Sequence, residues 1–275
     1  MNELSVENMK ADGVEVQMEQ LLPNGKGVWV PIDHGASEFP QDGLVDIKET
    51  IQALINAGVN AIVAQKGVVS AFSSLCEGTS TSMVAHLSVS TVHGGNDATR
   101  KVIVGDVKES IARGAKAVSC QINMGSVGEG DMIESMGKIT KKAFKHNVPV
   151  LGMVYARGEH LQTIDNDSTK GQAHAVRLAF ELGCHVAKSP WFPERQAFEQ
   201  IVGAAPIPVL IAGGARGQSD KEVLDMVELA MSWGAAGVCM GRQIFGHQNP
   251  EKMAAAIVAI VHEGRSADDA LNLLS

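Results

Sequence analysis

The sequence predicts a single (β/α)₈ barrel, an α/β fold, and three observations support this prediction. Eight short apolar runs alternate with longer amphipathic stretches, which is typical of repeated βα units around a parallel sheet. Four predicted helix-to-strand junctions carry a glycine, which adopts the left-handed conformation at little cost, in NAGVNAIVA, ARGAKAVSC, ELGCHVAKS and SWGAAGVCM. The length of 275 residues suits one barrel of about 250 residues.

Each predicted strand is an apolar run bounded by polar or glycine-bearing turns. Residues 1–25 precede the first run, and we expect them to cap the bottom of a single domain that spans 1–275. The strands are expected at 28–32, 61–64, 83–87, 117–122, 148–154, 184–187, 209–212 and 237–240. The clearest helices are expected at 44–56, 132–145, 171–182, 219–233 and 250–261. The segment QKGVVSAFSSLCEGTSTS is rich in small and polar residues, and we expect it to be mostly loop.

An open, doubly wound sheet also alternates strands with helices and is the alternative fold. Such sheets often carry a GxGxxG nucleotide fingerprint directly after the first strand. Here the first strand is followed by DHGAS. The barrel is therefore preferred.

Composition and charge exclude several function classes. The chain has 31 acidic and 23 basic side chains and a formal net charge of −8, so no general attraction to nucleic acid or to an anionic membrane is expected. The N-terminal segment lacks the features of a secretory signal, and no apolar run approaches the roughly 18 residues of a membrane helix. The four cysteines form no CxxC pair and are expected to be reduced and mostly buried. We expect a cytoplasmic protein.

In a barrel of this type, chemistry takes place where the carboxyl ends of the strands converge. This rule selects a small set of polar residues and glycines from the sequence. They are Asp33 and His34 after the first strand, Tyr155 and Arg157 after the fifth, Lys188 after the sixth, Gly213 and Gly214 after the seventh, and Gly241 and Arg242 after the eighth.

Lys188 ends the apolar run CHVA, so its amine is expected to project into the barrel mouth from an apolar wall. Desolvation lowers the pKa of a lysine from about 10.4, and a value near 7–8 would supply a neutral amine that attacks a ketone. The alternative is a strand-end lysine that extends into solvent. Lys66, in VAQKGVV, is the rival amine.

Two further groups at the mouth could move protons. Tyr155 is the only tyrosine and directly follows VPVLGMV, so its phenol could exchange a proton with a substrate, or it could be a rim aromatic. A carboxylate at Asp33 could help an amine to form a carbinolamine and to lose water, or it could bond only local backbone. His34 is expected to be a hydrogen-bonding neighbour of Asp33.

Two glycine-bearing turns, IAGGARGQSD and CMGRQIF, follow the seventh and eighth strands. Glycine lets backbone N–H groups approach an anion closely, which is how many barrels bind phosphate. Arg242 adds a cation with donors suited to phosphate oxygens. Arg216 could assist or could be solvated. We therefore expect a phosphorylated small-molecule substrate.

A metal centre is the competing type of site. His34, His86 and His93 could gather near the first and third strands, but no HExxH motif or paired-carboxylate spacing accompanies them. We expect no metal cofactor.

Five motifs in order resemble the DeoC/FbaB (DhnA-type) class I aldolase family: VPIDHGAS, GMVYARG, VAKSP, VLIAGGARG and GVCMGRQIF. The resemblance covers about residue 25 to the end. It implies that Lys188 is the Schiff-base lysine, Tyr155 the acid/base residue and Asp33 the carboxylate of the first strand. That family includes archaeal-type fructose-bisphosphate aldolases and 2-amino-3,7-dideoxy-D-threo-hept-6-ulosonate synthases.

The resemblance also implies a phosphate site that includes Gly214, Gly241 and Arg242, and a ring-based homo-oligomer, often a decamer. Reversible aldol cleavage of a phosphorylated ketose is the implied activity, with fructose 1,6-bisphosphate first and the aminoheptulosonate synthesis second. A metal-dependent barrel lyase or isomerase and a non-catalytic sugar-phosphate binder remain as alternatives.

The chain departs from this family in two places. Gln121, in SCQINMGS, stands where many members have a histidine, and SPWFPERQAF lacks the usual YTGD-like stretch. We expect both departures to affect the region that positions the second half of the substrate.

Overall fold

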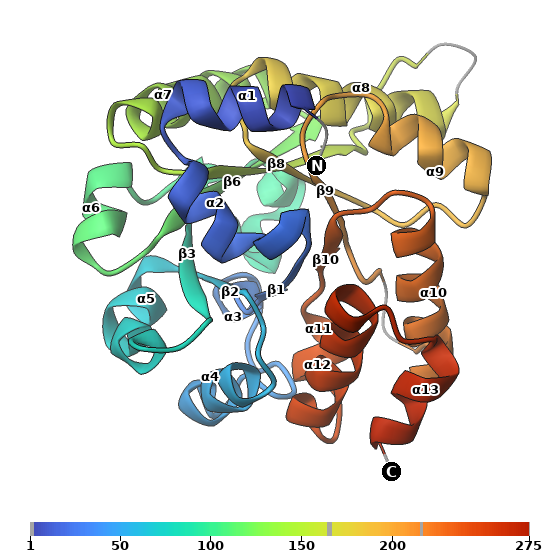
Figure 1. Cartoon of the computed structure of the whole chain (residues 1–275). Helices are drawn as coiled ribbons and strands as arrows, with labels where there is room; N and C mark the ends of the chain where they lie inside the picture. The colour runs from blue at the N-terminus through green and yellow to red at the C-terminus, as the bar shows by residue number, and fades with distance from the viewer. Residues whose placement is uncertain (1–2, 164–166, 215–216, 275) are drawn as a thin grey trace.

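The central feature of the computed structural model is a closed barrel of eight parallel strands, in the order β1-β10-β9-β8-β7-β6-β3-β2 (Figure 1). The structure describes residues 3–163, 167–214 and 217–274. The strands are β1 (Gly27–Pro31), β2 (Ala61–Ala64), β3 (Ser82–His86), β6 (Ala117–Met124), β7 (Val150–Ala156), β8 (Val186–Ser189), β9 (Val209–Ile211) and β10 (Gly237–Cys239). The predicted barrel is confirmed, and each strand lies within about two residues of its predicted bounds.

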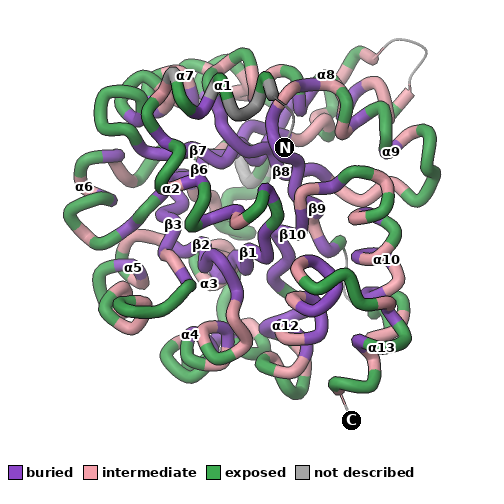
Figure 2. Tube along the Cα trace, in the orientation of Figure 1, coloured by how far each residue is buried: buried purple, intermediate pink, exposed green. Residues whose placement is uncertain are grey.

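Helices surround the barrel and bury their apolar faces against it, so that the exposed residues lie mostly on the outside (Figure 2). They are α4 (Ile47–Asn56), α5 (Lys66–Phe72), α6 (Val107–Ala112), α7 (Glu129–Lys145), α8 (Ser168–Glu181), α9 (Arg195–Val202), α10 (Asp220–Ser232) and α12 (Pro250–Val258). Two short helices directly follow strands, α3 (His34–Ser37) after β1 and α11 (Arg242–Phe245) after β10. After α12 come the π-helical turn Ala259–Glu263 and the short helix α13 (Ala267–Leu271). No helix in the described part of the chain has the length and hydropathy that crossing a membrane requires.

The expectation of a loop after β2 is wrong. Helix α5 and the 3-10 turn Ser73–Cys76 occupy most of that segment. Its small residues favour no helix on their own, but Val69 is fully buried and α5 packs against β3. Tertiary packing therefore overrides the weak local propensity.

Inside the barrel, successive side chains along each strand alternate between the interior and the helices. The interior positions near the strand starts are apolar and form one buried cluster with the N-terminal segment. This cluster includes Met18, Leu21, Leu22, Trp29, Ala61, Val84, Ala117, Leu151, Val186 and Leu210. The polar interior positions come later along the strands, so the barrel has an apolar floor beneath a polar mouth.

Two N-terminal helices, α1 (Glu3–Asp12) and α2 (Glu15–Leu21), lie across the end of the barrel where the strands begin (Figure 1). Trp29 in β1 donates its indole N–H to the Leu21 carbonyl over 2.8 Å. His185, just before β8, contacts Asp12 at the end of α1 over 2.9 Å between Nε2 and Oδ2. These bonds fix the N-terminal helices to the barrel floor.

His185 makes this contact dependent on pH. Its Nδ1 accepts the Val150 N–H over 3.2 Å, so Nε2 carries the single proton and the buried ring is neutral. Burial lowers the pKa of His185, while Asp12 opposes that shift. Below about pH 6.5 this histidine is protonated in the unfolded chain but stays neutral in the native protein. The free energy of unfolding therefore falls as the pH is lowered.

We therefore expect the urea midpoint of unfolding to fall between pH 7 and pH 5, partly because of His185. In the matched variant His185→Asn, an amide oxygen can still accept the Val150 N–H, but the side chain does not titrate. This variant should lose less stability than the wild type over the same pH interval. Equal losses in both proteins would show that His185 is not responsible.

Between β3 and α6 the chain forms an excursion, residues 88–103, that the sequence did not predict. Strands β4 (Ser88–Val89) and β5 (Val102–Ile103) pair antiparallel, with the 3-10 segment Val92–Thr99 between them. Asn123 in β6 donates its amide to the Thr99 carbonyl and so attaches the excursion to the barrel. The result is that Lys101 lies beside the barrel mouth.

Candidate active site

A cavity of about 340 Å³ opens where the strands end, and all nine residues predicted from the sequence line it. They come from the ends of five strands and the turns that follow. A larger hollow of about 630 Å³ lies near the strand starts, where its lining includes Glu19, Thr79 and Lys116. The amine, phenol, carboxylate and glycine turns converge in the first cavity, which is therefore the candidate active site.

Lys188 projects into this cavity because it shares the inward face of β8 with Val186. The side chain is buried, and the residue is only 8% exposed. Met153 in β7 is its partner in the sheet register, so Tyr155 occupies the next inward position on the neighbouring strand. The amine and the phenol thus lie on adjacent strands, and the phenol is two residues further toward the carboxyl end of its strand.

The predicted lowering of the Lys188 pKa is wrong. Burial does act in that direction, but Cys239, Tyr155 and Asp33 together outweigh it and raise the pKa of Lys188. Burial also raises the pKa values of Cys239 and Tyr155, so the anion that faces Lys188 at neutral pH is Asp33. The resting lysine is therefore protonated, and it must lose a proton before it can attack a ketone.

Asp33 lies between the end of β1 and α3, with His34 beside it and His86 from β3 opposite it. The carboxylate is 3.7 Å from His34 Nδ1 and 3.8 Å from His86 Nε2. Burial raises its pKa, but His86, His34 and Lys188 lower it more, so the net shift is downward. Asp33 is thus ionised at neutral pH and can accept a proton from Lys188.

Tyr155 is held in place by its neighbours on both sides. The Arg157 guanidinium lies over its ring, 4.5 Å from the ring centroid. Arg157 itself donates Nε–H to the Asn123 amide oxygen over 2.9 Å. Gln172 from α8 donates to the Val154 carbonyl over 3.0 Å, which fixes the end of β7. The phenol therefore enters the cavity from a rigid strand.

The two glycine turns follow neighbouring strands, β9 and β10, and contact each other at the cavity. Arg242 donates to the Gly214 carbonyl over 2.9 Å, and Gln243 donates to the carbonyls of Gly213 and Gly214. A Cβ atom at position 213 would lie 2.2 Å from the Gln243 side-chain oxygen, so a side chain there would displace Gln243.

Position 241 has a stricter steric requirement, because backbone lies in the way. A Cβ atom on Gly241 would lie 2.4 Å from the Pro31 carbonyl oxygen and 2.8 Å from a ring carbon of His34. Glycine therefore lets the turn after β10 approach the end of β1. Arg216, the possible helper in the first turn, lies outside the described residues.

Several cavity residues were missed by the sequence analysis. Lys101 lines the cavity and donates to Ser90 over 2.7 Å. Burial lowers its pKa, as does Arg157, while Asp33 opposes the shift. Cys239 lines the cavity with Lys188 and helps to raise the pKa of that lysine. No local pattern marks Lys101, but the inward position of Cys239 follows from the alternation of β10.

Two other expectations concern residues away from the proposed chemistry. The rival amine of Lys66 pairs with Glu109 of α6 over 3.1 Å, and its side chain is 40% exposed. His93 is exposed in the excursion, apart from His34 and His86. Within residues 3–163, 167–214 and 217–274, no group of three or more His, Cys, Asp and Glu side chains could hold a metal ion.

The two departures from the family pattern occupy different surroundings. Gln121 lines the cavity and donates its amide to Asn123 over 2.8 Å. In the SPWFP segment only Pro190 reaches the cavity, because Trp191 packs outside the barrel. Trp191 stacks on Trp233 with ring centroids 5.2 Å apart. Gln121 therefore offers a substrate a polar side chain, whereas the second departure offers it only Pro190.

Comparisons with known proteins agree with this geometry. Residues 28–247 match the family model described as DeoC/LacD family aldolase. The 2-amino-3,7-dideoxy-D-threo-hept-6-ulosonate synthase of Halobacterium salinarum is 36% identical over 94% of this chain and 95% of its own. A 2-amino-4,5-dihydroxy-6-oxo-7-(phosphonooxy)heptanoate synthase of Streptomyces griseus is 35% identical over 85% of this chain and 84% of its own.

Among solved structures, the chain is similar to an archaeal fructose-1,6-bisphosphate aldolase whose catalytic lysine is covalently bound to the carbinolamine intermediate of its substrate. The TM-score is 0.79 at 25% identity, covering 90% of this chain and 98% of the other.

Proposed function

The chain belongs to the DeoC/LacD family of aldolases, and from this premise we propose that it makes and breaks a C–C bond of a phosphorylated ketose through a Schiff base on Lys188. The observation that carries the proposal is the convergence of Lys188, Tyr155 and Asp33 in one cavity beside two glycine turns. No metal is required by this chemistry, because the iminium serves as the electron sink.

The reaction begins with proton transfer from the Lys188 ammonium to the Asp33 carboxylate. The neutral amine then attacks the ketone carbon to form a carbinolamine, and Asp33 returns its proton to the oxygen that leaves as water. In the cleavage direction, Tyr155 takes the proton of the hydroxyl on the carbon that becomes the aldehyde, and it passes its own phenolic proton to the Asp33 carboxylate. The electrons of the scissile C–C bond flow into the iminium and leave an enamine. Tyr155 then protonates the enamine carbon, and Asp33 returns a proton to the phenol.

The phosphate of the ketose half would bind at the turns after β9 and β10. Gly213, Gly214 and Gly241 allow close approach of the backbone, and the Arg242 guanidinium supplies a fixed positive charge. His34 lies between this site and Asp33, with its ring edge against Phe245 at a centroid distance of 5.2 Å. The substrate ketone would then lie over Lys188.

Replacing Arg242 with alanine should raise KM for a phosphorylated ketose by about 10- to 100-fold, because a charge-assisted hydrogen bond contributes roughly 1.5–3 kcal/mol. Cleavage of the corresponding unphosphorylated ketose should change little. Arg177→Ala on the outer face of α8, where Arg177 pairs with Glu181, is the matched control. Equal effects on both ketoses would contradict a phosphate role for Arg242.

The aldehyde half would bind on the other side of the mouth. Lys101 and Arg157 add positive charge there, which favours an aldehyde that carries a phosphate or carboxylate. Fructose 1,6-bisphosphate satisfies this requirement and is the first substrate to test. The synthases at 35–36% identity favour a second candidate, the condensation of a ketose-derived carbon fragment with an amino-acid-like aldehyde.

Borohydride reduction in the presence of substrate, followed by peptide mapping, tests the proposed chemistry. We expect a substrate-dependent mass increase on Lys188 that survives prior exhaustive chelation. A label on Lys66 or Lys101, or no label with any of a panel of phosphorylated ketoses, would contradict the mechanism. Loss of activity on chelation would instead favour a metal-dependent lyase. Binding without turnover would favour a sugar-phosphate binding protein.

The ring-shaped homo-oligomer, often a decamer, and the cytoplasmic location remain predictions. Light scattering coupled to size-exclusion chromatography tests the first of them, and cell fractionation tests the second.

A further inference from the structure

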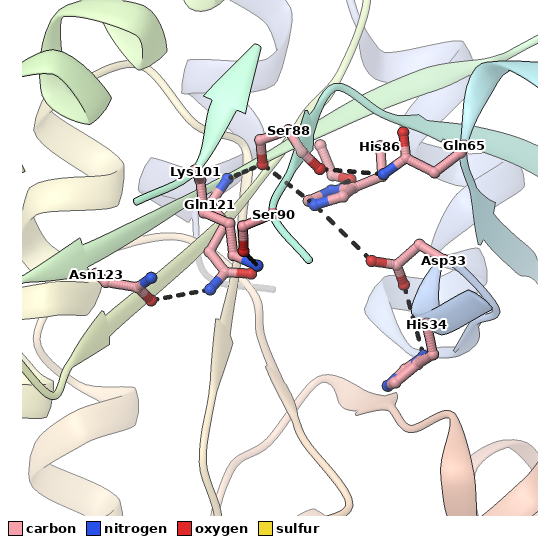
Figure 3. Close-up of polar contacts among 10 residues, drawn as sticks. Asp33, His34, Gln65, His86, Ser88, Ser90, Lys101, Gln121 and Asn123 are labelled. Carbon is pink, nitrogen blue, oxygen red and sulfur yellow. Dashed lines mark hydrogen bonds and ion pairs between the residues drawn. The ribbon is translucent and has the colours of Figure 1, made fainter. Parts of the chain in front are cut away.

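His86 is a buried histidine at the carboxyl end of β3, and the reaction described above does not use it. Its side chain is 2% exposed, and three groups surround its ring. Nδ1 lies 2.7 Å from the Ser119 hydroxyl, while Nε2 lies 3.2 Å from the Ser88 hydroxyl and 3.8 Å from Asp33 Oδ2. Figure 3 shows Nε2 directed at both Ser88 and the Asp33 carboxylate.

The serine contacts fix the ring rather than merely surround it. Ser88 accepts the Gln121 backbone N–H over 3.1 Å, so its oxygen is tied to β6 as well as to His86. Ser119 belongs to β6 and pairs with His86 in the sheet register. The imidazole therefore spans β3 and β6 and presents one nitrogen toward the end of β1.

The charges around His86 favour a neutral ring beside an ionised carboxylate. Burial lowers the pKa of His86, Asp33 opposes the shift, and the cations of Lys101 and Lys188 together with His34 reinforce it. Asp33 faces His86, His34 and Lys188, and its pKa is lowered overall. A neutral ring carries one proton, and the Asp33 anion 3.8 Å away attracts it electrostatically to Nε2, where the Ser88 hydroxyl at 3.2 Å is the hydrogen-bond partner. Nδ1 is then left to accept from Ser119.

We propose that His86 is a positioning residue that holds the Asp33 carboxylate in the orientation needed for proton exchange with Lys188. The inference rests on the proposed function. The Nε2–H dipole stabilises the Asp33 anion before it takes the lysine proton. It also limits rotation of the carboxylate, so the acid form returns that proton to the carbinolamine oxygen rather than to solvent.

Two variants separate this role from simple packing. In His86→Gln the amide nitrogen occupies the place of Nε2 and can still donate toward Asp33. In His86→Asn the side chain reaches only the place of Nδ1 and can bond Ser119 alone. We expect His86→Asn to lower kcat by about 100-fold with KM changed less than threefold, since small misplacement of a catalytic group costs about this much. His86→Gln should recover kcat to within about fivefold of the wild type.

The pH profile supplies a readout that packing alone would not change. The acid limb of kcat/KM reports the ionisation of Asp33 in the free enzyme. It should move to higher pH in His86→Asn, where the carboxylate loses the nearby N–H dipole, and stay near the wild-type position in His86→Gln. Both variants should show similar melting temperatures.

Equal losses of kcat in the two variants, or an unmoved acid limb in His86→Asn, would overturn the proposal. A large fall in melting temperature for His86→Asn alone would also overturn it, since the activity loss would then follow from packing. Borohydride labelling of Lys188 in the wild type is measured in parallel. If the wild type is labelled and the His86 variants behave alike, only this inference fails; if the wild type is not labelled, the proposed function fails first.

Discussion

Replacing Lys188 with methionine is expected to lower kcat by at least about 10⁴-fold and to abolish substrate-dependent borohydride labelling, because removal of a covalent nucleophile eliminates the pathway rather than weakening it. Methionine is unbranched and apolar, so it suits the largely apolar lower wall of the cavity. Phosphate binding should persist, because the turns after β9 and β10 are unchanged. Substrate binding measured by calorimetry should therefore remain within about tenfold of the wild type.

Two other lysines serve as comparisons. Lys66→Met removes an amine that pairs with Glu109 outside the cavity, so activity and labelling should stay at wild-type levels. Lys101→Met removes the second amine of the cavity lining, and labelling of Lys188 should persist while KM rises. If Lys101→Met abolishes labelling and Lys188→Met does not, the two lysines have been assigned in the wrong order.

The barrel could be predicted from the sequence because its signal is local and repeated. Each strand is a short apolar run, and each helix that was predicted has apolar residues at helical spacing. The rule that chemistry lies at the carboxyl ends of the strands then selected nine residues, all of which line one cavity. No long-range information was needed to assign these residues to the same end of the molecule.

The excursion after β3 could not be predicted in the same way. Its two strands have two residues each, Ser88–Val89 and Val102–Ile103, and so show no periodicity. Their pairing exists only because the chain turns back over the mouth and Asn123 bonds the Thr99 carbonyl. Lys101 therefore reaches the cavity through tertiary structure, without a sequence signal.

The protonation of Lys188 illustrates a second limit. The apolar run before it correctly predicts burial, and burial alone lowers a lysine pKa. The groups that reverse the shift are Cys239, Tyr155 and Asp33, which lie on or after three other strands. Their approach to the amine follows from the closure of the barrel. The same closure brings His86 to Asp33, which the spacing of residues 33 and 86 does not indicate.

Replacing Tyr155 with phenylalanine is expected to lower kcat by about 10²- to 10⁴-fold, the usual contribution of a general acid or base. The substitution removes one oxygen and leaves the ring, so the stacking of Arg157 and the packing of β7 should persist. Attack of the lysine depends on Asp33 rather than on the phenol. Lys188 should therefore still be labelled by borohydride, and at higher steady-state occupancy, because the intermediate forms but its C–C bond is not cleaved.

This pattern distinguishes Tyr155 from the other candidate proton carriers. Loss of labelling together with loss of turnover would mean that the phenol acts in imine formation, before C–C cleavage. A kcat near the wild-type value would mean that Asp33 alone moves both protons. Exchange of the substrate proton next to the imine carbon with solvent provides an independent measurement, because the enamine is reprotonated in that step. It should slow in Tyr155→Phe by about the same factor as kcat, since the proposed mechanism has the phenol return the proton to carbon.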